Sequence, residues 1–276
     1  MAELTDADDT RAHHRRRLWR SRPVAVGGGA FALAAFAGGS IVAGPAIGAA
    51  AVVAVALLVS LIVYLVARSA AEEDFFAAYA QSRGLRRSEG RSSLPPLSPL
   101  LQRGDDRYAE RRFDGVLPGG LDGTLALYTY EDESRDSDGN KQTTYYHFTV
   151  ATTQLPDTAA FVRELFCQRR FGFRFLDSAE DVFRRRQRVE HESAEVDERY
   201  EIFCAPDDDL NRARQVLAPS FLVWLSEHSP EAFAFELVAG SLVTNVKGHQ
   251  KSAAELDQFC QASAAVAQRL QAEATE

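Results

Sequence analysis

An uncharged run of 44 residues, from Val24 to Ala67, constrains this chain more than any other feature of its sequence. A helix needs about 20 apolar residues to cross the hydrocarbon core of a bilayer, so the run is about twice the length of one span. Gly44-Pro45 stands near the middle of the run, and this pair favours a tight turn between helices. The pattern predicts a transmembrane helical hairpin, with spans at 24–43 and 46–67 in contact with the lipid bilayer.

The two predicted spans differ in composition. The second is rich in Leu, Val and Ile, whereas the first consists mostly of Ala and Gly. Small residues let neighbouring helices approach closely, which would suit packing between the two spans, but a plain high-Ala composition explains the pattern equally well. Whether the first span inserts into the bilayer is therefore left open.

The arginines on both sides of the run predict its orientation. Several precede the first predicted span, among them Arg15, Arg16 and Arg17, and Arg68 follows the second. The positive-inside rule then places both termini in the cytoplasm of a multi-pass inner (plasma) membrane protein. An export signal is the alternative, but its apolar region has roughly 7–15 residues and ends at a cleavage site, whereas this run continues far beyond that length.

The charge of the whole chain conceals an asymmetry. The net charge is −8, yet residues 1–23 form a basic tail and 24–67 carry no charge, so the acidic excess lies in the remainder. An acidic body disfavours binding to nucleic acid. Cys167, Cys204 and Cys260 are few and odd in number, which fits a reducing compartment.

The part after the run divides into a linker region, 68–99, and a predicted cytoplasmic domain, 100–276. A juxtamembrane helix is expected over Ser69–Arg83, stopped by Gly84, and a linker rich in Ser and Pro over Ser88–Pro99. The fold class expected is an α+β soluble domain, made of antiparallel hairpins with packed helices and attached to the transmembrane hairpin.

Alternating β-branched and aromatic residues predict most of that domain. Hairpins are expected from 123–133 with 142–153, and from 233–238 with 241–247. Strands are also expected at 111–117, 171–176, 185–191 and 199–205, and helices at 156–169, 207–216 and 220–227. A closing helix should begin after Ser252, because Glu255 stands three residues later in capping-box spacing.

The motifs that could carry chemistry are incomplete. The acidic turn at 134–140 matches some calcium-loop positions, but Tyr145 stands where the bidentate Glu of an EF-hand belongs. The glycines between Gly115 and Gly123 precede a strand, whereas a phosphate loop precedes a helix, so they indicate a strand-to-strand turn. The cysteines form no C-x-x-C pair. The sequence thus predicts no catalytic, cofactor-binding or metal-binding residues, and no cofactor.

Three functional hypotheses remain from the residues alone. The first is a non-enzymatic cytoplasmic domain that binds an unknown protein partner or regulates a membrane process. The second is a membrane-tethered enzyme with a nonlocal site, in which Cys204 and His191 would serve as nucleophile and base. The third is a lipid-surface sensor that uses Phe75, Phe76 and the basic run Arg184–Arg188.

The segment Arg188–Pro219 combines an acidic E-S-x-E strand, an aromatic-rich strand, an acidic break and an A-R-x-x-L-x-P helix. Together with Y-A-x-x-R-G-L at Tyr79–Leu85, it resembles uncharacterised bacterial membrane proteins of actinobacterial type that carry a domain of unknown function. The resemblance implies a membrane-anchored cytosolic domain and supplies no catalytic residue.

Overall fold

The computed structural model describes residues 45–135, 137, 139–169, 186–190 and 200–275. Two compact units divide the chain, residues 1–79 and residues 80–276. The first contains most of helix α3, which runs over Pro45–Arg83, and the second contains the sheet and all the other described elements.

Helix α3 corrects the prediction of a membrane hairpin. It starts at Pro45, as expected of the second span, but it passes Ala67 without a break and continues through Glu72, Glu73 and Asp74 to Arg83. Within the part of the chain that the structure describes, no helix is both long enough and apolar enough to cross a membrane. The first predicted span, 24–43, lies outside the described residues. The two-span hairpin and the multi-pass inner-membrane location are therefore wrong.

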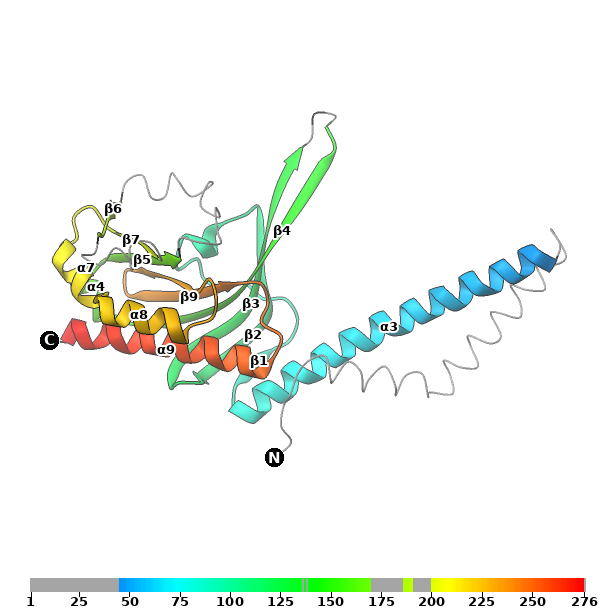
Figure 1. Ribbon diagram of the computed structural model, residues 1–276, viewed down its shortest axis with the longest axis horizontal. Coiled ribbons are helices and arrows are strands. Elements are labelled where there is room, and N and C mark those ends of the chain that lie inside the picture. The colour runs from blue at the N-terminus through cyan, green and yellow to red at the C-terminus, as the bar shows by residue number, and fades with distance from the viewer. Residues whose placement is uncertain (1–44, 136, 138, 170–185, 191–199, 276) are drawn as a thin grey trace. The chain divides into compact units, whose positions relative to one another are not determined.

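The second unit is built on one nine-stranded sheet in which every pair of neighbours is antiparallel (Figure 1). Its order is β1-β2-β3-β4-β9-β8-β5-β7-β6. The strands are β1 (Arg86–Ser88), β2 (Asp106–Leu117), β3 (Leu121–Arg135), β4 (Lys141–Gln154), β5 (Glu164–Arg169), β6 (Gln187–Arg188), β7 (Tyr200–Cys204), β8 (Ala234–Val238) and β9 (Ser241–Lys247). The helical segments are η1 (Leu100–Gln102), α4 (Thr158–Phe161), α7 (Leu210–Val216), α8 (Pro219–His228) and α9 (Ala253–Thr275).

Helix α9 covers one face of the sheet, and α7 and α8 pack beside it (Figure 1). The hydroxyl of Thr244 on β9 lies 2.6 Å from that of Ser263 on α9, so the contact between helix and sheet includes a buried hydrogen bond. The helix begins with the predicted capping box, since Ser252 and Glu255 exchange hydrogen bonds between side chain and backbone N–H. This face is referred to below as the α9 face.

The opposite face is covered by the segment that contains η1. Leu100 and Leu101 are buried there against Tyr128, Tyr130 and other side chains of the sheet. The stacked rings of Tyr130 and Phe148, with centroids 5.9 Å apart, come from neighbouring strands. Residues that alternate along β3 and β4 therefore serve two different cores, and this alternation decides which side chains reach the α9 face.

The fold class that the sequence indicated needs correction. Instead of separate hairpins beside helices and a membrane anchor, the second unit is dominated by one continuous antiparallel sheet. The predicted helix at 156–169 is also wrong, because only Thr158–Phe161 is helical and Glu164–Arg169 is strand β5, paired with both β7 and β8. The apolar residues of that segment fit a strand buried on both faces equally well. The predicted strand at 171–176 lies outside the described residues.

Gly123 offers a test of the sheet packing. A Cβ atom at this position would lie 2.2 Å from the carbonyl oxygen of Thr152 on β4, whereas at Gly120 it would meet open space although φ is +85°. We expect Gly123→Ala to lower the free energy of unfolding by more than Gly120→Ala, which should cost about 1–2 kcal/mol through backbone strain alone. Urea denaturation of both variants measures the difference. Equal losses of unfolding free energy in the two variants would contradict the close approach of Gly123 to the Thr152 carbonyl oxygen.

Candidate metal centre

Glu110 lies at a β-bulge in β2, on the α9 face. Ala109 pairs with Tyr128 and Arg111 pairs with Leu127, so Glu110 is the extra residue between two consecutive partners on β3. Ala109 belongs to the core on the side of η1, so the alternation of side chains along a strand places Glu110 on the α9 face, and the bulge changes its register against β3. The carboxylate of Glu110 approaches Thr129 of β3, whose hydroxyl lies 3.0 Å from Oε1.

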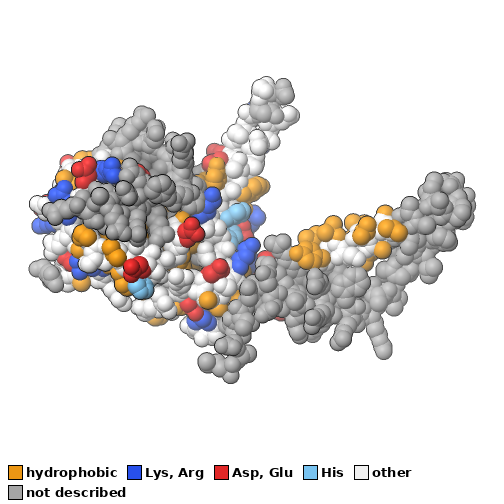
Figure 2. All heavy atoms as spheres, viewed as in Figure 1, with side chains coloured by type: hydrophobic (Ala, Val, Ile, Leu, Met, Phe, Trp, Pro, Cys, Tyr) orange, Lys and Arg blue, Asp and Glu red, His pale blue; other side chains and the backbone are white. Residues whose placement is uncertain are grey.

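The pairing of β3 with β4 supplies the second residue. Thr129 stands directly opposite His147, and the Thr129 hydroxyl lies 2.9 Å from His147 Nδ1. The side chain of His147 is 47% exposed, so it combines a fixed position on a central strand with access from solvent. In Figure 2, histidine side chains reach the surface at the base of the projecting β3–β4 hairpin.

The turn after β9 brings the third residue. Gly248 takes a φ of +81°, and its N–H donates to the carbonyl oxygen of His147, so the turn stays bonded to the middle of β4 before α9 begins. His249 then lies over the sheet with its side chain 14% exposed. The Thr149 hydroxyl donates to the Gly248 carbonyl oxygen and accepts from the Gln250 N–H, which holds the turn in place.

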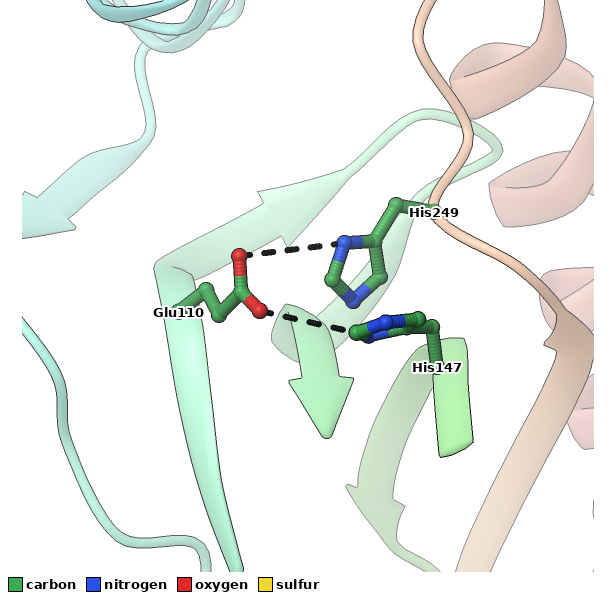
Figure 3. Close-up of side chains that lie close together, drawn as sticks. All are labelled: Glu110, His147 and His249. Carbon is green, nitrogen blue, oxygen red and sulfur yellow. Dashed lines mark ion pairs between the residues drawn. The ribbon is translucent and has the colours of Figure 1, made fainter. Parts of the chain in front are cut away.

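Three elements thus converge on one cluster, shown in Figure 3. One possible ligand atom from each of Glu110, His147 and His249 lies within 4.8 Å of the others. His147 Nδ1 is 4.0 Å from Glu110 Oε1, and His249 Nδ1 is 3.9 Å from Glu110 Oε2. The two imidazole rings meet edge to face, with centroids 4.8 Å apart.

The charge state of His249 favours a ligand role. Burial lowers the pKa of His249 below its ordinary value of 6.5, and His147 and Lys251 act in the same direction. Glu110 and the Tyr128 carbonyl oxygen oppose this shift without reversing it. The ring is therefore neutral at pH 7, and a neutral imidazole has the lone pair that a metal ion needs.

The donor set fits a divalent transition-metal ion. Two imidazoles and one carboxylate form a ligand combination found in catalytic zinc sites, which keep a fourth position for water. Ligand atoms about 2.1 Å from a tetrahedral zinc lie about 3.4 Å apart. Ligand atoms that are up to 4.8 Å apart therefore need to approach one another by as much as about 1.4 Å to share an ion. Among the described residues, Glu110, His147 and His249 are the one group of three such side chains this close together.

A hollow of about 630 Å³ lies elsewhere in the second unit, away from the cluster of Glu110, His147 and His249. Its wall includes Arg103, Tyr130, Glu164 and Arg186. Arg186 donates to Glu164 over 2.7 Å and lies 4.3 Å above the ring of Phe166. Arg186 and Glu164 thus form an ion pair in this wall. Such a pair is as typical of a structural contact as of a ligand site.

The structure describes some of the residues that the sequence suggested for chemistry. Cys204 lies on β7 with no exposed surface, and burial raises the pKa of its thiol to about 11, so it is protonated at neutral pH. His191 lies outside the described residues. Phe75 and Phe76 are buried, so they are not displayed to a lipid surface. Of the basic run, Arg184 and Arg185 lie outside the described residues.

Sequence reasoning missed Glu110, His147 and His249 because no local spacing joins them. The three residues come from β2, β4 and the turn before α9, and only the sheet order brings these elements together. One weak signal existed, since three of the six histidines, His147, His191 and His249, lie within or just after predicted strands. The β-bulge at Glu110 has no comparable signature in the sequence.

Comparison with known proteins adds no family to these observations. No protein-family model matches the chain, and neither a curated protein nor a solved structure is similar to it. The resemblance of Arg188–Pro219 to uncharacterised bacterial membrane proteins therefore stays a prediction, without the membrane anchor that it implied.

The burial of all three cysteines gives a direct test of Cys204 as a nucleophile. Cys167, Cys204 and Cys260 are each buried, and burial raises the pKa of Cys167 and Cys204. Because the thiolate is the reactive form, we expect iodoacetamide at pH 8 to label none of them in the folded protein and all of them in denaturant. Mass spectrometry counts the adducts. Rapid labelling of Cys204 in the folded protein would restore the nucleophile hypothesis.

Proposed function

We propose that this protein binds a divalent transition-metal ion of the zinc type through Glu110, His147 and His249. The observation that carries the proposal is the convergence of two imidazoles and one carboxylate from three separate elements within 4.8 Å. An exposed acidic group is common without a metal, but a carboxylate beside two histidines whose rings are in contact is a more specific arrangement.

The surroundings of the ligands support the same function. Metal-binding histidines usually donate their other ring N–H to a carbonyl, carboxylate or hydroxyl oxygen, which orients the ring. His249 Nε2 lies 3.2 Å from the Tyr128 carbonyl oxygen, and His147 Nδ1 lies 2.9 Å from the Thr129 hydroxyl. Each histidine therefore has the kind of partner that an orienting hydrogen bond requires.

A bound metal ion would connect β2, β4 and the turn before α9. Binding to the folded state alone stabilises a protein by about 2.7 kcal/mol when the free ion is at 100 times its Kd. The prediction that this domain binds a protein partner or regulates a membrane process stays untested. The metal site stands independently of that role.

Metal binding is tested by isothermal titration of the metal-free full chain with Zn²⁺. We expect one ion per chain. We also expect His147→Ala, His249→Ala and Glu110→Gln each to weaken binding by more than about 10–100-fold, which is the effect of removing a residue that only hydrogen-bonds to a ligand. Because Mg²⁺ and Ca²⁺ prefer oxygen ligands, neither should bind at this site.

His228→Ala is the matched control for this titration. His228 is an exposed histidine on α8 that stacks on Trp224 with ring centroids 5.1 Å apart, and it is not one of the cluster residues. Its variant should bind Zn²⁺ as the unchanged protein does. Binding by all three cluster variants at full affinity would refute the proposal.

The pH dependence of loading follows from the state of His249. Since its pKa is lowered, the neutral ligand form is present at pH 7 and is lost as the pH falls through a value below 6.5. Zn²⁺ affinity should therefore change little between about pH 8 and pH 7 and should fall steeply toward about pH 5. Competition with a chromophoric chelator measures it. An affinity that stays constant down to pH 5 would exclude histidine ligands.

A further inference from the structure

Thr129 lies at the centre of the cluster although it is not itself a candidate ligand. It is fully buried, and its hydroxyl oxygen lies 3.0 Å from Glu110 Oε1, 2.9 Å from His147 Nδ1 and 3.4 Å from His249 Nε2. An aliphatic side chain in place of Thr129 would leave Glu110, His147 and His249 without a contact to this hydroxyl. One hydroxyl thus touches every member of the cluster.

The protons at this hydroxyl can be assigned by counting them. Two oxygens 3.0 Å apart need one proton between them, and an ionised carboxylate has none to give, so the Thr129 hydroxyl donates to Glu110. A hydroxyl carries a single proton. At His147 Nδ1 the Thr129 oxygen must therefore act as acceptor, and the Nδ1–H of His147 is the donor.

His249 is constrained in the complementary way. Its Nε2 lies 3.2 Å from the Tyr128 carbonyl oxygen, which can only accept, so Nε2 carries the proton. Thr129 lies near the same Nε2 as a second acceptor. The nitrogen without a proton is then Nδ1, which faces Glu110 Oε2 at 3.9 Å.

We propose that Thr129 is the positioning residue of this centre, and that it fixes His147 in the Nδ1–H tautomer while it orients the Glu110 carboxylate. The inference rests on the proposed metal-binding function and extends it by assigning the donor nitrogens. The nitrogen without a proton is then Nε2 in His147 and Nδ1 in His249, and Glu110 keeps Oε2 available. The 4.0 Å separation of His147 Nδ1 from Glu110 Oε1 is accordingly not a separation of two ligand atoms. The two histidines bind through different ring nitrogens because their partners differ.

The test compares Thr129→Val with Thr129→Ser. Valine keeps the shape of the side chain and removes the hydroxyl, whereas serine retains the hydroxyl. In the metal-free full chain, ¹⁵N shifts of the imidazole rings should show His147 as the Nδ1–H tautomer. We expect Thr129→Val to move His147 toward the Nε2–H tautomer and to weaken Zn²⁺ binding by about 10–100-fold, and Thr129→Ser to restore most of both.

Thr244→Val is the matched control, because Thr244 is also a buried threonine on the α9 face and its hydroxyl bonds to Ser263 instead. It should change neither the tautomer nor the Zn²⁺ affinity. An Nε2–H tautomer of His147 in the unchanged protein would overturn the proposal, as would a Thr129→Ser variant that behaves like Thr129→Val. If the unchanged protein binds no Zn²⁺, the metal function fails, while the tautomer still decides the role of Thr129.

Discussion

The pairing of β3 with β4 is the constraint on which the second unit depends. Their register extends from Thr124 opposite Thr152 to Arg135 opposite Lys141, and it fixes which side chains face α9 and which face η1. A shift of β4 by one residue against β3 would exchange the two faces of β4, moving His147 to the side of Tyr128 and away from Thr129. Two buried faces, each with its own apolar set, make such a shift costly.

The candidate centre follows from that register together with two local irregularities. The bulge at Glu110 and the left-handed turn at Gly248 each interrupt regular structure, and each delivers one residue to the position that β3 and β4 define. Backbone irregularities next to a polar cluster are frequent at functional sites, because they re-aim side chains that regular strands would separate. The paired strands β3 and β4 hold Thr129 and His147 in place, and the bulge and the turn place Glu110 and His249 beside them.

Sequence patterns predicted the local elements of this chain better than its long-range organisation. The hairpins β3–β4 and β8–β9 and the capped start of α9 are visible in the sequence, because alternation, turn residues and capping boxes act over a few residues. The strand β5 was mistaken for a helix, since a short apolar segment buried on both faces has no distinguishing period.

The uncharged run shows a different limit of sequence reasoning. Its composition indicated a break near Gly44-Pro45, and α3 does begin at Pro45. The helix predicted over Ser69–Arg83 is also confirmed, because α3 ends at Arg83, but the pattern was interpreted as a membrane span followed by a separate helix rather than as one helix. The cluster of Glu110, His147 and His249 was beyond reach for another reason. Its members are brought together by strand order and a bulge, and neither property is encoded by the spacing of residues along the chain.

X-ray absorption at the zinc edge tests the central claim most directly, because it reports the ligands of the bound ion. For the Zn²⁺-loaded full chain, the account predicts two imidazole nitrogens at about 2.0–2.1 Å together with oxygen ligands, and one imidazole fewer in His249→Ala. A spectrum that contains only oxygen ligands, or one that is unchanged in His249→Ala, would contradict the assignment of this cluster as a metal centre.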